Sequence, residues 1–197
     1  GYFAAAEIAA REKKIGIIAI EVARPDLPVA DRSTFADKDP RAAAKGLYVI
    51  RDFAPGPRHG YVVCQGAFAT YNTVKVLPKL VQAGINVKVI SAVSEELFDR
   101  QPESYRESVL PKGAKQDLMF VIGSTRRMWP LRNVGAQADD YSLTSDWDNQ
   151  WLTGGLEADV IAEAHLDPDS VFAGVKRFAD ERAARLKAQR EALDSLG

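Results

Sequence analysis

The side chains best suited to catalysis are few in this sequence and stand far apart along it. The two histidines, His59 in GPRHG and His165 in AEAHLDP, are candidate general bases or metal ligands, but neither has a second strong ligand at a fitting spacing. We therefore favour a loop histidine and a histidine at a helix end. Cys64 lies inside an apolar run, which favours a small buried hydrophobe over a nucleophile. The sequence predicts no catalytic residue and no metal site.

Arg24 is the best candidate for binding a ligand. It follows an apolar run and immediately precedes Pro25, and α/β proteins bind ligands at the carboxyl ends of parallel strands. A guanidinium group can bind two oxygens of a phosphate or carboxylate at once. From residue type alone, the favoured alternative is a surface charge that pairs with Asp26 or Asp31. The glycines of APGPRHG and LTGGLE fit neither phosphate-binding pattern and are interpreted as turns.

Composition excludes several classes of protein. The 197 residues are 46% hydrophobic, enough for a substantial core, and 26 Lys and Arg against 27 Asp and Glu give a net charge of -1. This balance provides no large basic field for nucleic acid. One cysteine allows no internal disulfide, and no apolar run reaches the roughly 20 residues that span a bilayer. We expect no membrane partner and a cytoplasmic location, and the opening GYFAAAEIAAREKK, without Met, suggests a fragment.

The spacing of apolar residues then predicts the elements. The run IGIIAIEVA, residues 15–23, predicts a strand that is buried on both faces, and the Pro-rich and Asp-rich stretch after it predicts a linker. A strand at 60–67, a helix at 70–84 that ends at Gly84, and a strand at 85–93 form a right-handed crossover with a parallel pair. A third strand of the main domain is predicted at 117–123.

Helices account for much of the remainder. SEELFD and PESYRESVL predict two short helices, and Asp167 followed by Pro168 predicts the start of a longer one. Its apolar stripe consists of Val171, Phe172, Val175 and Phe178. Beyond residue 178 the chain is mostly charged, and we favour a solvated extension over a helix that lies on a partner. The fold class is α/β: a three-layer αβα domain with a mostly parallel sheet of about five strands.

The stretch FDRQPESYRESVLP, residues 98–111, connects two predicted strands, yet it combines charged residues, two prolines and a tyrosine in a way that a freely variable loop would not require. Phe98, Tyr105, Val109 and Leu110 would dock one face of it on the sheet, while its charged residues form surface pairs. Its sequence resembles that of the carboxy-terminal domain of transketolases, which has a Phe-Asp-x-Gln segment followed by Tyr-Arg-x-Ser-Val-Leu-Pro. The agreement covers nine positions: Phe98, Asp99, Gln101, Tyr105, Arg106, Ser108, Val109, Leu110 and Pro111.

Further segments agree in the same order along the chain. KGLYVIRDF is similar to the start of that domain, AGINVKVIS to its second strand, and MWPLRNVG to its Trp followed by Val-Gly. ARPDLP resembles the family's Ser-Arg-Gln-Asn-Leu-Pro, where Ala23 replaces Ser and Pro25-Asp26 replaces Gln-Asn. The resemblance implies a division into residues 1–24, the tail of a pyrimidine-binding domain; 25–46, a linker; and 47–197, the carboxy-terminal domain.

The resemblance also implies a function. The parent enzyme would transfer a two-carbon ketol unit between sugar phosphates, with this domain serving packing and dimer assembly, and Arg24 would contact the phosphate of the sugar substrate. Thiamine diphosphate and Mg²⁺ would be held by missing amino-terminal domains or by a separate thiamine-binding subunit, so the isolated chain would bind no cofactor and be inactive. The parent would be a homodimer. The alternatives are the C-terminal part of a 2-oxo acid dehydrogenase E1 component and a non-enzymatic assembly or regulatory module.

Overall fold

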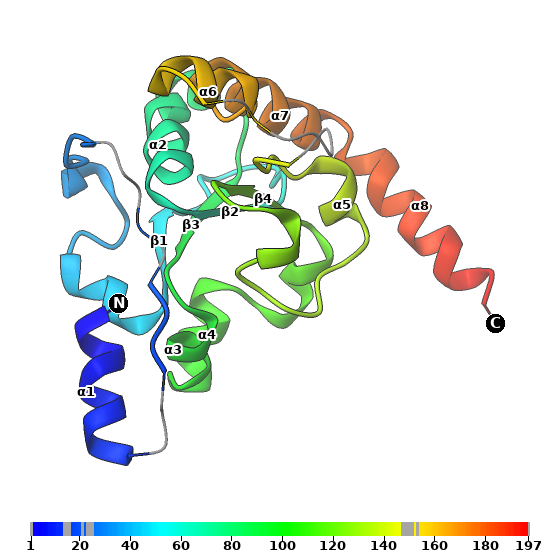
Figure 1. The fold of residues 1–197 in the computed structure, drawn as a ribbon. Coiled ribbons are helices and arrows are strands. Elements are labelled where there is room, and N and C mark those ends of the chain that lie inside the picture. Colours follow the sequence, from blue (N-terminus) through cyan, green and yellow to red (C-terminus); the bar gives the residue numbers. More distant parts are fainter. Residues whose placement is uncertain are drawn as a thin grey trace.

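The computed structural model describes residues 2–13, 17–20, 22, 26–146, 152 and 154–196. Its centre is a four-stranded sheet with the strand order β1-β3-β2-β4 (Figure 1). The strands are β1 (Leu47–Arg51), β2 (Tyr61–Gln65), β3 (Lys88–Ala92) and β4 (Leu118–Ile122). The α-helices are α1 (Tyr2–Glu12), α2 (Ala67–Gln82), α3 (Glu95–Asp99), α4 (Glu103–Val109), α5 (Gln137–Tyr141), α6 (Glu157–Glu163), α7 (Pro168–Asp180) and α8 (Arg182–Asp194). The 3₁₀ helices are η1 (Arg32–Thr34), η2 (Pro40–Lys45), η3 (Lys112–Gln116) and η4 (Arg126–Met128).

The predicted three-layer architecture is confirmed. β2 pairs in parallel with both β3 and β4, while β1 pairs antiparallel with β3. The β2-α2-β3 crossover lies where the sequence predicts it, and Gly84 adopts a φ of 72° just beyond α2, where a glycine ends a helix without strain. The sheet has four strands in the described residues, against the expectation of about five.

Both faces of the sheet are buried, which explains the continuous apolar runs in its strands. Side chains alternate along β2, so that Val62 and Cys64 belong to one core and Val63 to the other. The first core is covered by α2 and α7, and the second by α3, α4 and α5. Figure 1 shows α2, α6 and α7 on one side of the sheet and α3 and α4 on the other.

Both edges of the sheet are protected by irregular chain. Along β1, the backbone N–H groups of Ala36 and Asp37 donate to Ile50 and Val49, and the Asp37 carboxylate accepts from the Val49 N–H at 2.8 Å. Along β4, Leu143 forms an isolated parallel bridge. Since exposed edges invite pairing with other chains, these contacts limit that risk. The stretch predicted as a linker is therefore ordered against the sheet from residue 36.

The prediction of a buried strand at residues 15–23 is wrong for the part that the structure describes. Residues 17–20 and 22 belong to no strand, and Ile17 is 87% exposed and Val22 78% exposed. The remaining positions of that run lie outside the described residues. A strand needs neighbours on both sides to satisfy its backbone and cover its faces, and this domain offers no free edge to it.

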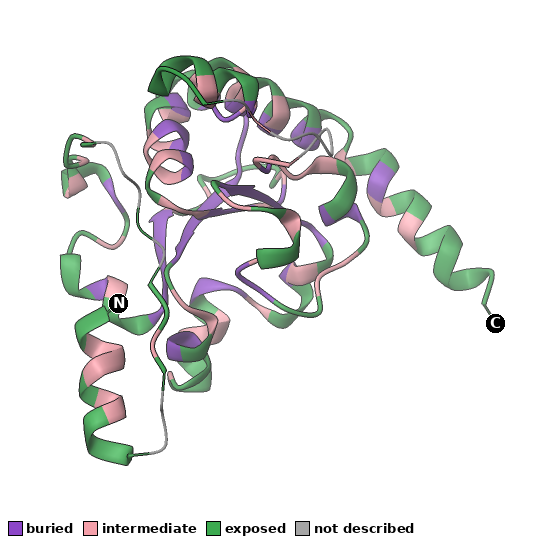
Figure 2. Ribbon diagram, viewed as in Figure 1, coloured by how far each residue is buried: buried purple, intermediate pink, exposed green. Residues whose placement is uncertain are grey.

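The carboxy-terminal helix α8 extends away from the body of the domain (Figure 1) and is largely exposed (Figure 2). This agrees with the predicted solvated extension, except that Arg185 in its first turns is buried. None of the described helices combines the length and the apolar character needed to cross a membrane.

Candidate functional site

The residues that the sequence singled out for chemistry are not brought together. Arg24 lies outside the described residues. Cys64 is fully buried in β2, and burial raises the pKa of its thiol to about 12. A thiol with so high a pKa stays protonated and is not a nucleophile near neutral pH. The interpretation of Cys64 as a buried hydrophobe is confirmed.

The histidines occupy structural positions. His59 lies in the loop before β2, where its Nδ1 accepts a hydrogen bond from the backbone N–H of Asn86 at 2.9 Å. His165 follows α6 with a φ of 54° and ends that helix. Within the described part of the chain, no three His, Cys, Asp or Glu side chains gather in a way that could hold a metal ion.

Residues 98–111 make structural contacts, as their sequence suggests. The Tyr105 hydroxyl donates to the Leu47 carbonyl at 2.8 Å, which fixes α4 to the start of β1. The buried Lys88 ammonium donates to the Ser108 carbonyl at 2.7 Å. Phe98 forms part of the second core, and Val109 and Leu110 lie in it too. These contacts explain why residues 98–111 need specific side chains, although they only connect two strands.

A pocket of about 250 Å³ opens at the carboxyl ends of the parallel strands. We call it the strand-end pocket. Four chain segments line it: Ala19 of the amino-terminal segment, the end of β2, the turn from β3 into α3, and the loop after η4. The side chains that matter most are Gln65, Val93, Glu95, Glu96, Trp129 and Arg132.

Charged groups on the rim of the strand-end pocket pair with one another. Glu95 lies 3.3 Å from the Arg132 guanidinium and 3.6 Å from the Lys115 ammonium, and it accepts the Arg132 backbone N–H at 3.0 Å. Glu96 lies 3.8 Å from Arg132. The pKa of Glu96 is lowered, first by its own backbone N–H, then by the Ser94 hydroxyl and by Arg132. This carboxylate therefore stays ionised at neutral pH.

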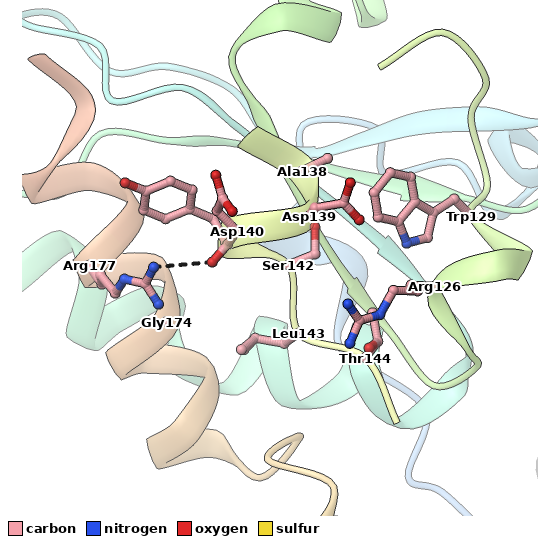
Figure 3. Close-up of a pocket in the computed structure, with 11 residues that line it drawn as sticks. Arg126, Trp129, Ala138, Asp139, Asp140, Ser142, Leu143, Thr144, Gly174 and Arg177 are labelled. Atoms are coloured by element: carbon pink, nitrogen blue, oxygen red, sulfur yellow. Dashed lines mark hydrogen bonds between the residues drawn. The ribbon is translucent and has the colours of Figure 1, made fainter. Parts of the chain in front are cut away.

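A second pocket of about 210 Å³ lies between η4, α5 and α7 (Figure 3). Its two arginines are engaged with neighbours: Arg177 donates to the Asp140 carbonyl at 3.1 Å, and Arg126 donates to the Asp146 carbonyl at 3.2 Å. Burial raises the pKa of Asp146, but hydrogen bonds from Thr144 and from the Arg126 backbone outweigh it, so that the pKa is lowered overall. Among the described residues that line this pocket there is no histidine and no cysteine.

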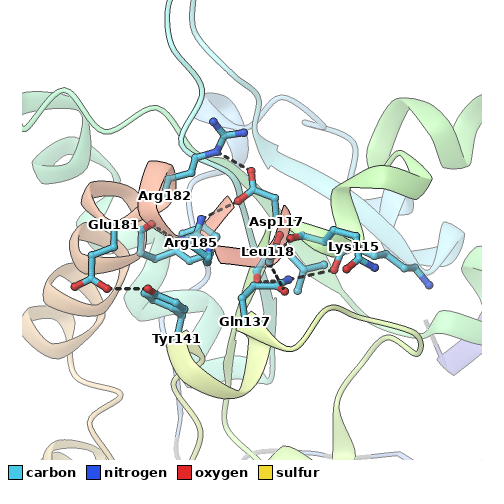
Figure 4. Close-up of polar contacts among 11 residues, drawn as sticks. Lys115, Asp117, Leu118, Gln137, Tyr141, Glu181, Arg182 and Arg185 are labelled. Atoms are coloured by element: carbon cyan, nitrogen blue, oxygen red, sulfur yellow. Dashed lines mark hydrogen bonds and ion pairs between the residues drawn. The ribbon is translucent and has the colours of Figure 1, made fainter. Parts of the chain in front are cut away.

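A buried ion-pair cluster holds α8 to the sheet (Figure 4). Asp117, directly before β4, accepts from Arg182 Nε and from Arg185 Nη2, both at 2.7 Å. Arg185 also donates to the Phe178 carbonyl at 2.6 Å, and its guanidinium lies 3.8 Å from the centroid of the Phe178 ring. This cluster was not predicted, because the sequence of a charged helix carries no sign of which of its arginines is buried.

Gln65 and Trp129 were missed as well. An uncharged amide after an apolar run matches no motif, and residues 124–156 show no clear periodicity. Gln65 ends β2 in the structure but lies inside the strand predicted at 60–67, and Trp129 was noted only for its match to the Trp of the family, without a role in binding.

Comparisons with known proteins agree with this architecture. The family model of the transketolase-like TK C-terminal domain matches residues 46–143. A chloroplastic transketolase of Zea mays is 37% identical over 134 residues, which are 68% of this chain and 19% of the relative. Transketolase 2 of Escherichia coli is 33% identical over 158 residues, 78% of this chain and 23% of the relative. The chain thus spans about a fifth of the length of these curated relatives.

Solved structures show the same fold. The transketolase of Leishmania mexicana superimposes with a TM-score of 0.54 at 20% identity, covering 72% of this chain and 19% of that one. A Pichia stipitis transketolase in complex with sedoheptulose-7-phosphate gives 0.53 at 23% identity, covering 74% and 19%. Together with the family match and the curated relatives, this shows that the chain carries a C-terminal domain of the transketolase family.

Proposed function

We propose that this chain is the carboxy-terminal portion of a transketolase-like enzyme that transfers a two-carbon ketol unit between sugar phosphates. The observation that carries the proposal is the family match over residues 46–143, which includes all four strands and residues 98–111. Pichia stipitis relatives of the same fold have been solved with xylulose-5-phosphate and sedoheptulose-7-phosphate, both ketose phosphates. The relatives named above are transketolases, which favours ketol transfer over oxidation of a 2-oxo acid.

The cofactor belongs to other parts of the parent enzyme in this proposal. Thiamine diphosphate with Mg²⁺ would supply carbanion stabilisation. We assign both groups to missing amino-terminal domains or to a separate thiamine-binding subunit, because the chain covers only 19% and 23% of the length of the two transketolases compared above. This domain would serve subunit packing and assembly of a homodimer in the cytoplasm.

The amino-terminal segment supports the proposed division of the chain. We propose that residues 1–24 are the tail of a pyrimidine-binding domain, that residues 25–46 are a linker, and that residues 47–197 are the carboxy-terminal domain. Ile17, Ile20 and Val22 are exposed in the described structure. Apolar side chains in such a row are stabilised by about 1.5–3 kcal/mol each when a neighbouring sheet buries them fully. A preceding domain would provide that sheet.

A domain exchange tests the proposed function. This chain would replace the matching segment of Escherichia coli transketolase 2, and ketol transfer from xylulose-5-phosphate would be measured with thiamine diphosphate and Mg²⁺. Because the domain contributes packing, we expect the chimera to retain activity within about tenfold of the natural enzyme, a loss of about 1.4 kcal/mol at most in transition-state stabilisation. The chain alone should show no transfer. A folded, dimeric chimera without activity would contradict the proposal.

Arg24 is our proposed contact to the phosphate of the sugar substrate. In the active chimera, Arg24→Leu should raise the KM for the sugar phosphate about tenfold to a hundredfold, since a hydrogen bond to a charged group contributes about 1.5–3 kcal/mol. The kcat should change little, because the phosphate is remote from the reacting carbons. Arg58→Leu, in a loop of the carboxy-terminal domain, is the matched control. An unchanged KM for Arg24→Leu would refute the assignment.

A further inference from the structure

The face formed by η2 and α3 carries the amino-terminal segment of the chain. α1 packs against η2, and Glu12, the last residue of α1, pairs with Arg100 directly after α3. Further along the chain, Ala19 lines the strand-end pocket together with Glu95, the first residue of α3. The segment therefore lies at both ends of α3, and Figure 1 shows it running back beside that helix.

The packing of α1 on this face is thin. None of its residues is buried, and the half-buried ones include Ala5, Ile8 and Ala9. These three share one side of the helix with Glu12, because positions 5, 8, 9 and 12 recur at helical spacing. A helix of 11 residues is marginal in water on its own. The helical structure of α1 therefore depends on its docking.

The pair between Arg100 and Glu12 contributes a large share of so small an interface. The Nη1 and Nη2 atoms of Arg100 donate to the two carboxylate oxygens of Glu12, at 2.6 and 3.2 Å. Two parallel bonds of this kind are stronger and more specific in geometry than a single contact. The two side chains are 42% and 38% exposed, so the pair is partly shielded from solvent.

We propose that the η2–α3 face is a docking surface from which the amino-terminal segment separates as a unit while the sheet stays folded, and that the Arg100–Glu12 pair sets the equilibrium between the two states. Local opening is typical of regions with few buried apolar contacts. The strand-end pocket loses part of its lining in the open state, because Ala19 belongs to this segment. The inference does not depend on the proposed ketol transfer. In the proposed division of the chain, it gives the preceding domain a movable attachment to this one.

Hydrogen exchange of the ¹⁵N-labelled full chain, followed by NMR, tests the proposal. The amides of α1 should exchange faster than those of β3, which become accessible only when the sheet opens. Arg100→Gln removes the pair and should lower the protection of the amides of residues 8–12 about twofold to fivefold, as expected for a partly exposed ion pair. Arg100→Glu brings two carboxylates together and should lower it further. Neither variant should change the protection of β3.

A charge exchange separates this role of Arg100 from an effect on α3 itself, since a negative charge at the carboxyl end of a helix disfavours that helix. The double variant Glu12→Arg with Arg100→Glu forms the pair in reverse, and it should bring the protection of α1 back to within about twofold of the natural chain. Arg190→Glu, exposed on α8, is the matched control and should leave α1 unchanged. The proposal is overturned if α1 and β3 exchange at the same rate, if Arg100→Glu does not affect α1, or if the double variant exchanges as fast as Arg100→Glu.

Discussion

Asp117→Ala is expected to lower the free energy of unfolding by about 3–5 kcal/mol, because it leaves a buried guanidinium without its counter-charge. The side chain of Arg185 is only 4% exposed, and Asp117 is its ionic partner at 2.7 Å. Arg182 loses its bond to the same carboxylate. These two arginines hold α8, so the variant should also release that helix. Urea denaturation followed by circular dichroism measures the first effect, and the rate of tryptic cleavage within α8 measures the second.

A surface ion pair provides the matched control. Asp169 pairs with Lys79 at 3.0 Å, but its side chain is 90% exposed, and such pairs contribute about 0–1 kcal/mol. Asp169→Ala should therefore change stability by less than about 1 kcal/mol. The double variant Asp117→Leu with Arg185→Leu should be more stable than Asp117→Ala, since it removes both buried charges. A loss below about 1 kcal/mol for Asp117→Ala would mean that water reaches Arg185 and that the cluster does not anchor α8.

Local sequence signals were sufficient for the central unit of the fold. β2 and β3 are short continuous apolar runs, α2 between them has helical spacing, and Gly84 marks the end of α2. Asp167 marks the start of α7 in the same way, as its N-cap. The direction of β1 was not predictable in this way. β1 pairs antiparallel with β3. The direction of a strand depends on the path of the chain before it, and the sequence of a five-residue strand contains no information about that path.

The run at residues 15–23 shows that a local pattern can also predict burial that the structure does not show. Its apolar composition predicts burial on both faces, but Ile17 and Val22 are exposed because both edges of the sheet are already occupied. An apolar pattern indicates that a segment needs other elements to cover its side chains, but it does not indicate whether those elements belong to the same domain. The strand-end pocket was not predicted, because its lining comes from segments far apart in the sequence that only the fold brings together.

Gly46→Ala is expected to be the other strongly destabilising change, lowering the free energy of unfolding by about 2–6 kcal/mol. Gly46 has a φ of 90°, which costs a residue with a Cβ about 1–3 kcal/mol. A Cβ at this position would lie 2.3 Å from both the Phe98 nitrogen and the Ser94 oxygen, which are backbone atoms of the α3 region and cannot turn aside. Relieving such overpacking costs about a further 1–3 kcal/mol.

The backbone shift would also weaken the bonds that start α3, because the Gly46 carbonyl accepts from the N–H groups of Val93 at 2.7 Å and Ser94 at 3.1 Å. Urea denaturation of Gly46→Ala should therefore show a lower midpoint, and hydrogen exchange should show faster exchange at these two amides than in the natural chain. Gly113→Ala is the matched control: Gly113 is exposed, and no atom lies within 4 Å of an added Cβ. It should change stability by no more than about 0.5 kcal/mol. Equal effects of the two substitutions would show that α3 moves freely relative to β1, which would contradict the structural role assigned to residues 98–111.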